Sequence, residues 1–180
     1  MKDRRKYVRK SMPAVCVLIL ALTGAKTTWA LQAGDAMPAF AQQGLVHGKM
    51  LRSDYFRGKV LYVDFWASWC GPCRVSLPAM NGIYQEFKGE GFEVLAVNLD
   101  KNPADAKRFL KQHPVGYYVV TDDGSLPRQF GLKGMPTAYL IDRRGTIRRV
   151  HEGFRPGDDE RLRKQIRLLL NESNGATASP

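Results

Sequence analysis

The stretch that decides the fold is VLYVDFWASWCGPC, which occupies residues 60–73. Its first half, residues 60–66, is an almost uninterrupted apolar run, typical of a strand buried on both faces of a sheet. Its second half places Cys70 and Cys73 at the start of an amphipathic stretch that predicts a helix to about residue 88. The sequence therefore predicts a cysteine pair at the point where a helix follows a buried strand.

This position has chemical consequences for the two sulfurs. A helix N-terminus offers unsatisfied N–H groups and the positive end of the dipole, so we expect the pKa of Cys70 to lie below that of a free cysteine. Cys73 follows about one helical turn later, within reach of Cys70, and is expected to be the more buried. Pro72 suits the first turn because its φ is fixed and it has no N–H. The pattern predicts thiol–disulfide exchange, with Cys70 attacking and Cys73 resolving the mixed disulfide.

Asp64 is an acidic residue within the apolar strand. Burial of a carboxyl raises its pKa, and strand alternation places Asp64 on the same face as Trp66. We therefore predict that Asp64 serves as the base for Cys73, through a water. The alternative is a structural carboxylate at a strand end that faces solvent or caps a neighbouring element.

The rest of the chain alternates predicted strands and helices. Apolar runs predict further strands at 92–99, 117–121, 137–141 and 146–151, and helices at 103–112, 126–130 and 156–170, with a short hairpin around 47–49. Helices that alternate with buried strands predict an α/β fold, in which a central sheet is covered on both faces.

The first thirty residues predict an export segment. They hold seven basic residues and one acid, and an apolar run over 12–22 that is too short to cross a bilayer comfortably. We expect a signal peptide cleaved after Ala30, with an uncleaved N-terminal anchor as the alternative. Residues 31–172 would then form the domain and 173–180 a flexible tail. Export predicts a periplasmic or other extracytoplasmic location, tethered to the inner membrane if the N-terminus stays attached, where a disulfide can persist.

Composition excludes two other classes of function. The 180 residues carry 28 Lys and Arg against 17 Asp and Glu, but these cations are scattered outside the export segment, so we expect no nucleic-acid partner. A structural zinc site needs four ligands, whereas the chain has one cysteine pair and three histidines without ligand spacing. We expect no metal and no cofactor, and we assign His47, His113 and His151 to surface or loop positions.

Two motifs resemble a known family. Residues 63–73 resemble the active-site segment of thioredoxins, and residues 134–137, Gly-Met-Pro-Thr, resemble the family's cis-proline loop. An N-terminal extension with residues 58–60, 92–100 and 140–142 is similar to the exported TlpA-like/ResA-like branch, which includes cytochrome c maturation thioredoxins. The resemblance covers roughly residues 34–170. It implies a thioredoxin-like three-layer fold, a central mixed sheet flanked by helices, with an N-terminal extension.

The resemblance also implies roles for individual residues. Cys70 would attack, Cys73 would resolve, and Pro136 would adopt a cis peptide against the cysteine pair while the Met135 backbone pairs with an extended substrate. The remaining substrate contacts would come from Trp69, Gly71 and Pro72, with Trp66 and Trp69 walling the site and core packing as the alternative for Trp66.

The chain departs from the family pattern at two positions. Ser76 stands where many cytochrome-maturation members carry a glutamate, and Ala96 stands where thioredoxins carry a lysine.

These observations predict an exported, monomeric thiol–disulfide oxidoreductase that reduces protein disulfides, with cytochrome c maturation as one candidate role. The direction follows from Gly71-Pro72, a dipeptide shared with thioredoxins, whose potential is low at about −270 mV. Its partners would be disulfide-containing exported proteins and a membrane electron donor. A disulfide oxidase or isomerase, and a non-catalytic thioredoxin-fold assembly factor, remain as alternatives.

Overall fold

The computed structural model of the protein describes residues 30–46 and 48–172. The predicted signal or anchor and the predicted tail at 173–180 therefore lie outside the described residues, as does His47. Within the described ranges, every helix is too short or too polar to cross a membrane.

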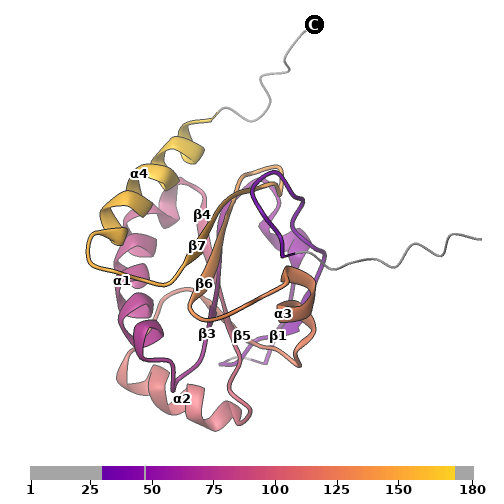
Figure 1. The fold of residues 1–180 in the computed structure, drawn as a ribbon, viewed down its shortest axis with the longest axis vertical. Helices are drawn as coiled ribbons and strands as arrows, with labels where there is room; N and C mark the ends of the chain where they lie inside the picture. The colour runs from indigo at the N-terminus through magenta and orange to yellow at the C-terminus, as the bar shows by residue number, and fades with distance from the viewer. Residues whose placement is uncertain (1–29, 47, 173–180) are drawn as a thin grey trace, which may run out of the picture.

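A five-stranded mixed sheet forms the centre of the molecule, in the order β5-β4-β3-β6-β7 (Figure 1). Strands β3 and β4 are parallel, as are β4 and β5, whereas β6 runs antiparallel to both β3 and β7. The strand bounds are β3 (Val60–Trp66), β4 (Phe92–Asn98), β5 (Tyr118–Thr121), β6 (Thr137–Ile141) and β7 (Ile147–Glu152). The predicted hairpin is present as a separate antiparallel pair, β1 (Ala41–Gln43) and β2 (Met50–Arg52).

Helices cover the sheet and complete three layers. In Figure 1, α1 and α4 lie on one side of the sheet, and α3 lies with β1 on the other. The helix bounds are α1 (Gly71–Phe87), α2 (Pro103–Gln112), α3 (Ser125–Phe130) and α4 (Asp158–Asn171), with 3-10 turns η1 (Ser53–Phe56) and η2 (Lys88–Glu90). The expected thioredoxin-like fold is confirmed, and each predicted element lies within two residues of its expected bounds.

Strand β3 separates two hydrophobic clusters. All seven of its residues are buried, and alternate side chains point to opposite faces. Val60, Tyr62 and Trp66 join the cluster beneath α1, α2 and α4, while Leu61, Val63 and Phe65 join the cluster on the α3 side. A strand that feeds two cores must be apolar throughout, which is the pattern that residues 60–66 show.

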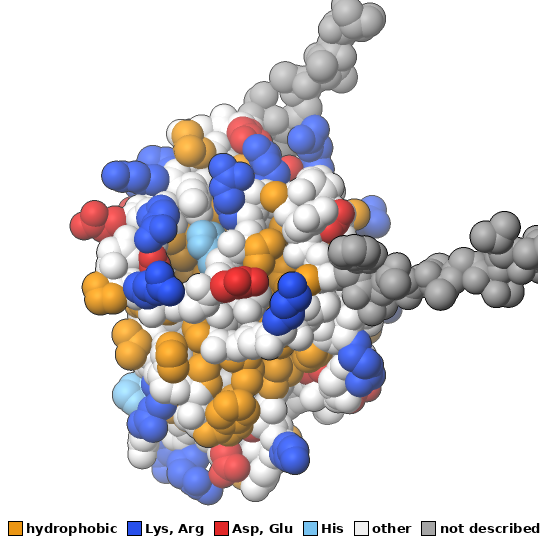
Figure 2. Space-filling model, viewed as in Figure 1, with side chains coloured by type: hydrophobic (Ala, Val, Ile, Leu, Met, Phe, Trp, Pro, Cys, Tyr) orange, Lys and Arg blue, Asp and Glu red, His pale blue; other side chains and the backbone are white. Residues whose placement is uncertain are grey.

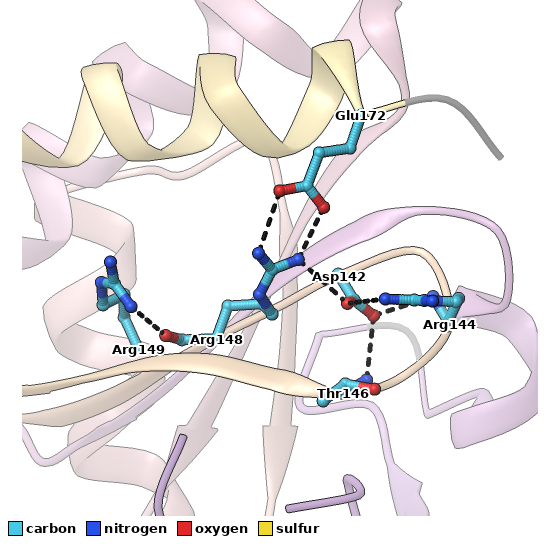
Figure 3. A network of polar contacts seen from close by, with 6 residues as sticks. All are labelled: Asp142, Arg144, Thr146, Arg148, Arg149 and Glu172. Carbon is cyan, nitrogen blue, oxygen red and sulfur yellow. Dashed lines mark hydrogen bonds and ion pairs between the residues drawn. The ribbon is translucent and has the colours of Figure 1, made fainter. Parts of the chain in front are cut away.

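The turn between β6 and β7 is held by a buried carboxylate (Figure 3). Asp142 accepts N–H bonds from Arg144 at 2.9 Å and Thr146 at 3.0 Å, and its second oxygen lies 3.3 Å from the Arg148 guanidinium. Arg148 also donates two hydrogen bonds to Glu172, at 2.6 and 2.9 Å. The turn is thereby tied to the residue that follows α4, so the last helix is fixed against the sheet edge.

Candidate active site

Cys70 and Cys73 are joined by a disulfide at the beginning of α1. Cys70 is the N-cap residue, and its Sγ accepts the backbone N–H of Cys73 at 3.3 Å. Cys70 keeps 6% of its surface exposed and Cys73 keeps none, in agreement with the expected difference in burial. A partner from solvent can therefore reach Cys70 but not Cys73. The helix N-terminus and the Cys73 N–H would both stabilise negative charge on the Cys70 sulfur once the pair is reduced.

The Met135–Pro136 peptide bond is cis, as the resemblance implied. Thr137 donates its hydroxyl to the Gly134 carbonyl at 2.8 Å, and the Gly153 N–H bonds the Pro136 carbonyl at 2.8 Å, so the loop is anchored on both sides. Met135 is half-buried and packs against the hydrophobic cluster that contains both cysteines. The cis-proline loop and the cysteine pair thus share one hydrophobic cluster, while Gly134 remains exposed.

Asp64 lies in the middle of β3 on its α1 side, 3% exposed. Its neighbours on the adjacent strands are Ala96 of β4 and Ala138 of β6, which bring no charge and no hydrogen-bonding side chain. Burial raises the pKa of Asp64 to about 7, the direction expected from its sequence context. The alternative prediction, that the Asp64 carboxyl faces solvent, is therefore wrong. Ala96 lies beside Asp64 on the next strand, as the sequence predicted.

The two tryptophans of the motif lie in different environments. Trp69 is 69% exposed beside Cys70, whereas Trp66 is fully buried, with its ring centroid 5.5 Å from that of Phe109 in α2. Trp66 is therefore a core residue, the alternative that the sequence left open for it, and it belongs to the hydrophobic cluster that also contains Cys70 and Cys73. Alternation along β3 directs it beneath α2 instead of toward solvent.

A polar clamp that sequence reasoning missed holds the loop between β3 and α1. The buried Asp100 carboxylate accepts hydrogen bonds from the Ser68 N–H at 3.0 Å, the Ser68 hydroxyl at 2.9 Å and the Asn98 amide at 2.8 Å. A signal was available, because parallel strands end at the same edge of a sheet. The polar residues that follow β3 and end β4 therefore had to meet.

Two further expectations concern Ser76 and the histidines. Ser76 is buried in α1 and donates its hydroxyl to the Cys73 carbonyl at 3.2 Å, so this position brings no carboxyl to the site. His113 is exposed after α2, as expected. His151 is not a surface or loop residue: it is half-buried on β7, its ring lies 6.0 Å from that of Tyr62, and its Nε2 has no hydrogen-bond partner among the described residues.

No metal site is visible in the part of the chain that the structure describes. Across residues 30–46 and 48–172, His, Cys, Asp and Glu side chains do not gather in groups of three or more that could hold an ion. The chemistry that this arrangement supports is exchange between sulfur atoms.

Replacing Asp64 by Asn should change how stability depends on pH. Because folding raises the pKa of Asp64 from 3.8 to about 7, its favourable contribution is complete below about pH 4 and is lost as pH rises through 7. We expect the free energy of unfolding of Asp64→Asn, relative to the unmodified oxidised protein, to be about 2–3 kcal/mol higher at pH 8 than at pH 5. Urea unfolding at the two pH values measures this difference. The exposed control Asp54→Asn should show less than about 0.5 kcal/mol, and equal pH dependence with and without the Asp64 carboxyl would contradict the burial argument.

Replacing Asp100 by Ala should loosen the loop before Cys70. Three donors, one buried and two part-buried, would lose their acceptor, at a cost of about 3 kcal/mol in the free energy of unfolding, and the Ser68 amide should exchange with solvent faster. Chemical denaturation and hydrogen exchange measure the two effects. The matched control is Asp105→Ala, which removes a surface ion pair with Arg108 and should cost less than about 1 kcal/mol. If the two variants prove indistinguishable, the clamp does not hold the loop.

Comparison with known proteins agrees with this geometry. The Redoxin family model matches residues 32–166. The thiol-disulfide oxidoreductase ResA of Bacillus thuringiensis subsp. konkukian is 32% identical over 118 residues, which cover 65% of this chain and 68% of the relative. ResA of Bacillus subtilis is 29% identical over 157 residues, covering 84% of this chain and 87% of the relative.

A solved structure extends the comparison to three dimensions. A crystal structure from Chlorobium tepidum, assigned to a thiol:disulfide interchange protein DsbE, superposes with a TM-score of 0.75 at 47% identity, and covers 78% of this chain and 99% of that one. The family match, these relatives and the cysteine pair at the start of α1 agree: the chain belongs to the Redoxin family and is a thiol–disulfide oxidoreductase.

Proposed function

We propose that the protein is an exported reductant of protein disulfides, in which Cys70 attacks and Cys73 resolves. The observation that carries the proposal is the unequal burial of two sulfurs that share one helix N-terminus. The exposed edge of Cys70 is the point of contact with a substrate, and the enclosed Cys73 can react only with the sulfur beside it.

The reaction proceeds in two exchanges that conserve electrons and protons. The Cys70 thiolate attacks one sulfur of the substrate disulfide, a mixed disulfide forms, and the other substrate sulfur leaves as a thiolate that takes up a proton. Cys73 then loses its proton and attacks the Cys70 sulfur, which releases the second substrate thiolate. The substrate gains two electrons and the protein ends with the Cys70–Cys73 disulfide.

Asp64 is the proposed base for the second exchange. It lies on the face of β3 that packs against α1, the helix that carries Cys73. A carboxyl with a pKa of about 7 can take a proton near neutral pH and return it later, which a surface carboxylate of ordinary pKa does poorly. A water would carry the proton between the carboxyl and the sulfur.

The surface around Cys70 suits an extended substrate segment. Trp69, Gly71 and Pro72 are exposed next to Cys70 in the chain, and Met135, which precedes the cis proline, packs against the hydrophobic cluster that contains Cys70. The cis proline has no N–H, which leaves the Met135 backbone to pair with the substrate. These residues form the proposed substrate groove.

The reducing direction and the location have separate support. Gly71-Pro72 is the dipeptide of thioredoxins, whose potentials lie near −270 mV. The basic and apolar N-terminal sequence supports export to an extracytoplasmic compartment. A reductant there must be reduced again after each cycle, so a membrane electron donor belongs to the proposal.

Replacing Cys73 by Ser should arrest the cycle at the mixed disulfide. We expect Cys73→Ser, expressed in cells with its N-terminal segment, to accumulate covalent adducts with partner proteins. Dithiothreitol should reduce the mixed disulfides and release these partners. The adducts should be absent from the matched double variant that also carries Cys70→Ser. Non-reducing electrophoresis followed by mass spectrometry detects them, and adducts that survive the loss of Cys70 would overturn the assignment of the attacking sulfur.

The potential of the Cys70–Cys73 couple should decide the direction of exchange. We expect a value near −270 mV, measured by equilibration with glutathione or dithiothreitol buffers. A value near −120 mV would identify the protein as a disulfide donor instead.

A further inference from the structure

We propose that the substrate of this protein presents its disulfide within an acidic segment, which docks on an apolar patch at Cys70 surrounded by unpaired cations. The inference rests on the proposed function and specifies the chemical class of its substrate. It depends on the side chains around Cys70, which the exchange chemistry itself does not use.

Large apolar side chains are exposed at the start of α1. Trp69 is 69% exposed and Val75 63%, and both lie within five residues of Cys70. In the space-filling view, hydrophobic side chains gather on the lower part of the face, near the start of α1 and α2 in Figure 1, with Lys and Arg side chains beside them (Figure 2). An apolar centre with a polar rim is the usual anatomy of a protein-binding surface.

The rim is basic on the elements that border the disulfide. Its exposed cations come from the first turn of α1, the end of β4, the outer face of α2 and the cis-proline loop: Arg74, Lys101, Lys107, Lys111 and Lys133. Arg74 is held in place, because its guanidinium lies 5.8 Å from the Phe109 ring centroid. A fixed guanidinium in the helix turn that follows Cys70 offers a carboxylate a defined partner.

These five cations form no ion pair in the part of the chain that the structure describes. Among the described residues, none of the five has a carboxylate oxygen within 4.0 Å of its charged nitrogens. The acids on the same elements are already engaged, since Asp105 pairs with Arg108 at 3.2 Å and Asp100 is buried in the Ser68 clamp. Glu152 near the cis-proline loop and Asp123 after β5 are exposed acids at this edge of the sheet, and the five cations outnumber them. The charge left at the rim is therefore positive.

A positive rim around an apolar contact selects its partner by charge. Complementary charge raises the rate of encounter by ten- to a thousand-fold, and the gain falls steeply as salt screens the field. An acidic segment would thus meet Cys70 faster than a neutral or basic one, without any change in the exchange chemistry.

The test compares disulfide peptides that differ only in charge. Three peptides carry the same disulfide, flanked by Glu, by Gln or by Lys, and stopped-flow measurements give their second-order rate constants with the reduced full-length protein. We expect the Glu peptide to react about tenfold faster than the Gln peptide at low ionic strength, and the Lys peptide to be slowest. The advantage should shrink to about twofold at roughly 0.5 M salt.

Matched charge reversals separate the rim from the overall charge. Lys107→Glu, Lys111→Glu and Lys133→Glu together should abolish the advantage of the Glu peptide while leaving the rate with a small neutral disulfide unchanged. The control reverses Arg57, Lys88 and Arg144, which lie before β3, after α1 and in the β6–β7 turn, at the far end of the sheet. The control should keep most of the advantage.

The outcomes are distinct. Equal rates for the three peptides, or an equal loss in the control, would overturn the acidic-substrate proposal and leave the reductase function standing. Equal rates together with binding to anionic vesicles would assign the cations to a membrane surface and also overturn it. Failure of every peptide and of the small disulfide to react would instead refute the proposed function.

Discussion

Strand β3 packs against two hydrophobic clusters at once, and this double burial fixes where the chain can do chemistry. A strand buried on both faces has its position set by everything around it, so the point at which it leaves the sheet is equally fixed. The chain then passes through the loop held by Asp100 and enters α1, which places Cys70 at a helix N-terminus. The burial of β3, the Asp100 clamp and the start of α1 together fix the location and the electrostatic environment of the Cys70 sulfur.

The same burial gives Asp64 its unusual proton affinity. The residues paired with Asp64 on the neighbouring strands are alanines, which offer no cation or donor to offset the loss of water, and the pKa of the carboxyl rises to about 7. The fold thus tolerates a destabilising group in its centre. A buried carboxyl of raised pKa is commonly found where a protein needs a titrating group near neutral pH.

Much of this could be predicted from the sequence, and the rest depended on contacts between distant segments. The apolar run at 60–66 and the alternation of predicted strands and helices after it predicted the sheet, because buried strands consist of apolar residues. The cysteine motif predicted the pair and the difference in burial of its sulfurs. The positions of Trp66 and His151 could not be predicted in the same way: a tryptophan next to an active-site motif suits core and groove equally, and His151 is enclosed by packing from β7 and the elements beside it. The Ser68–Asp100 clamp joins the ends of two strands, and becomes visible only when their parallel register is known.

The clamp has a consequence for recognition. Asp100 fastens the loop of Trp69 to the end of β4, the strand that leads into Lys101 and α2, so the apolar patch and much of the basic rim belong to one connected unit. A surface that is already ordered before its partner arrives loses little conformational entropy on association. Weak, brief encounters can then remain selective, which suits an electron carrier that must release each partner quickly.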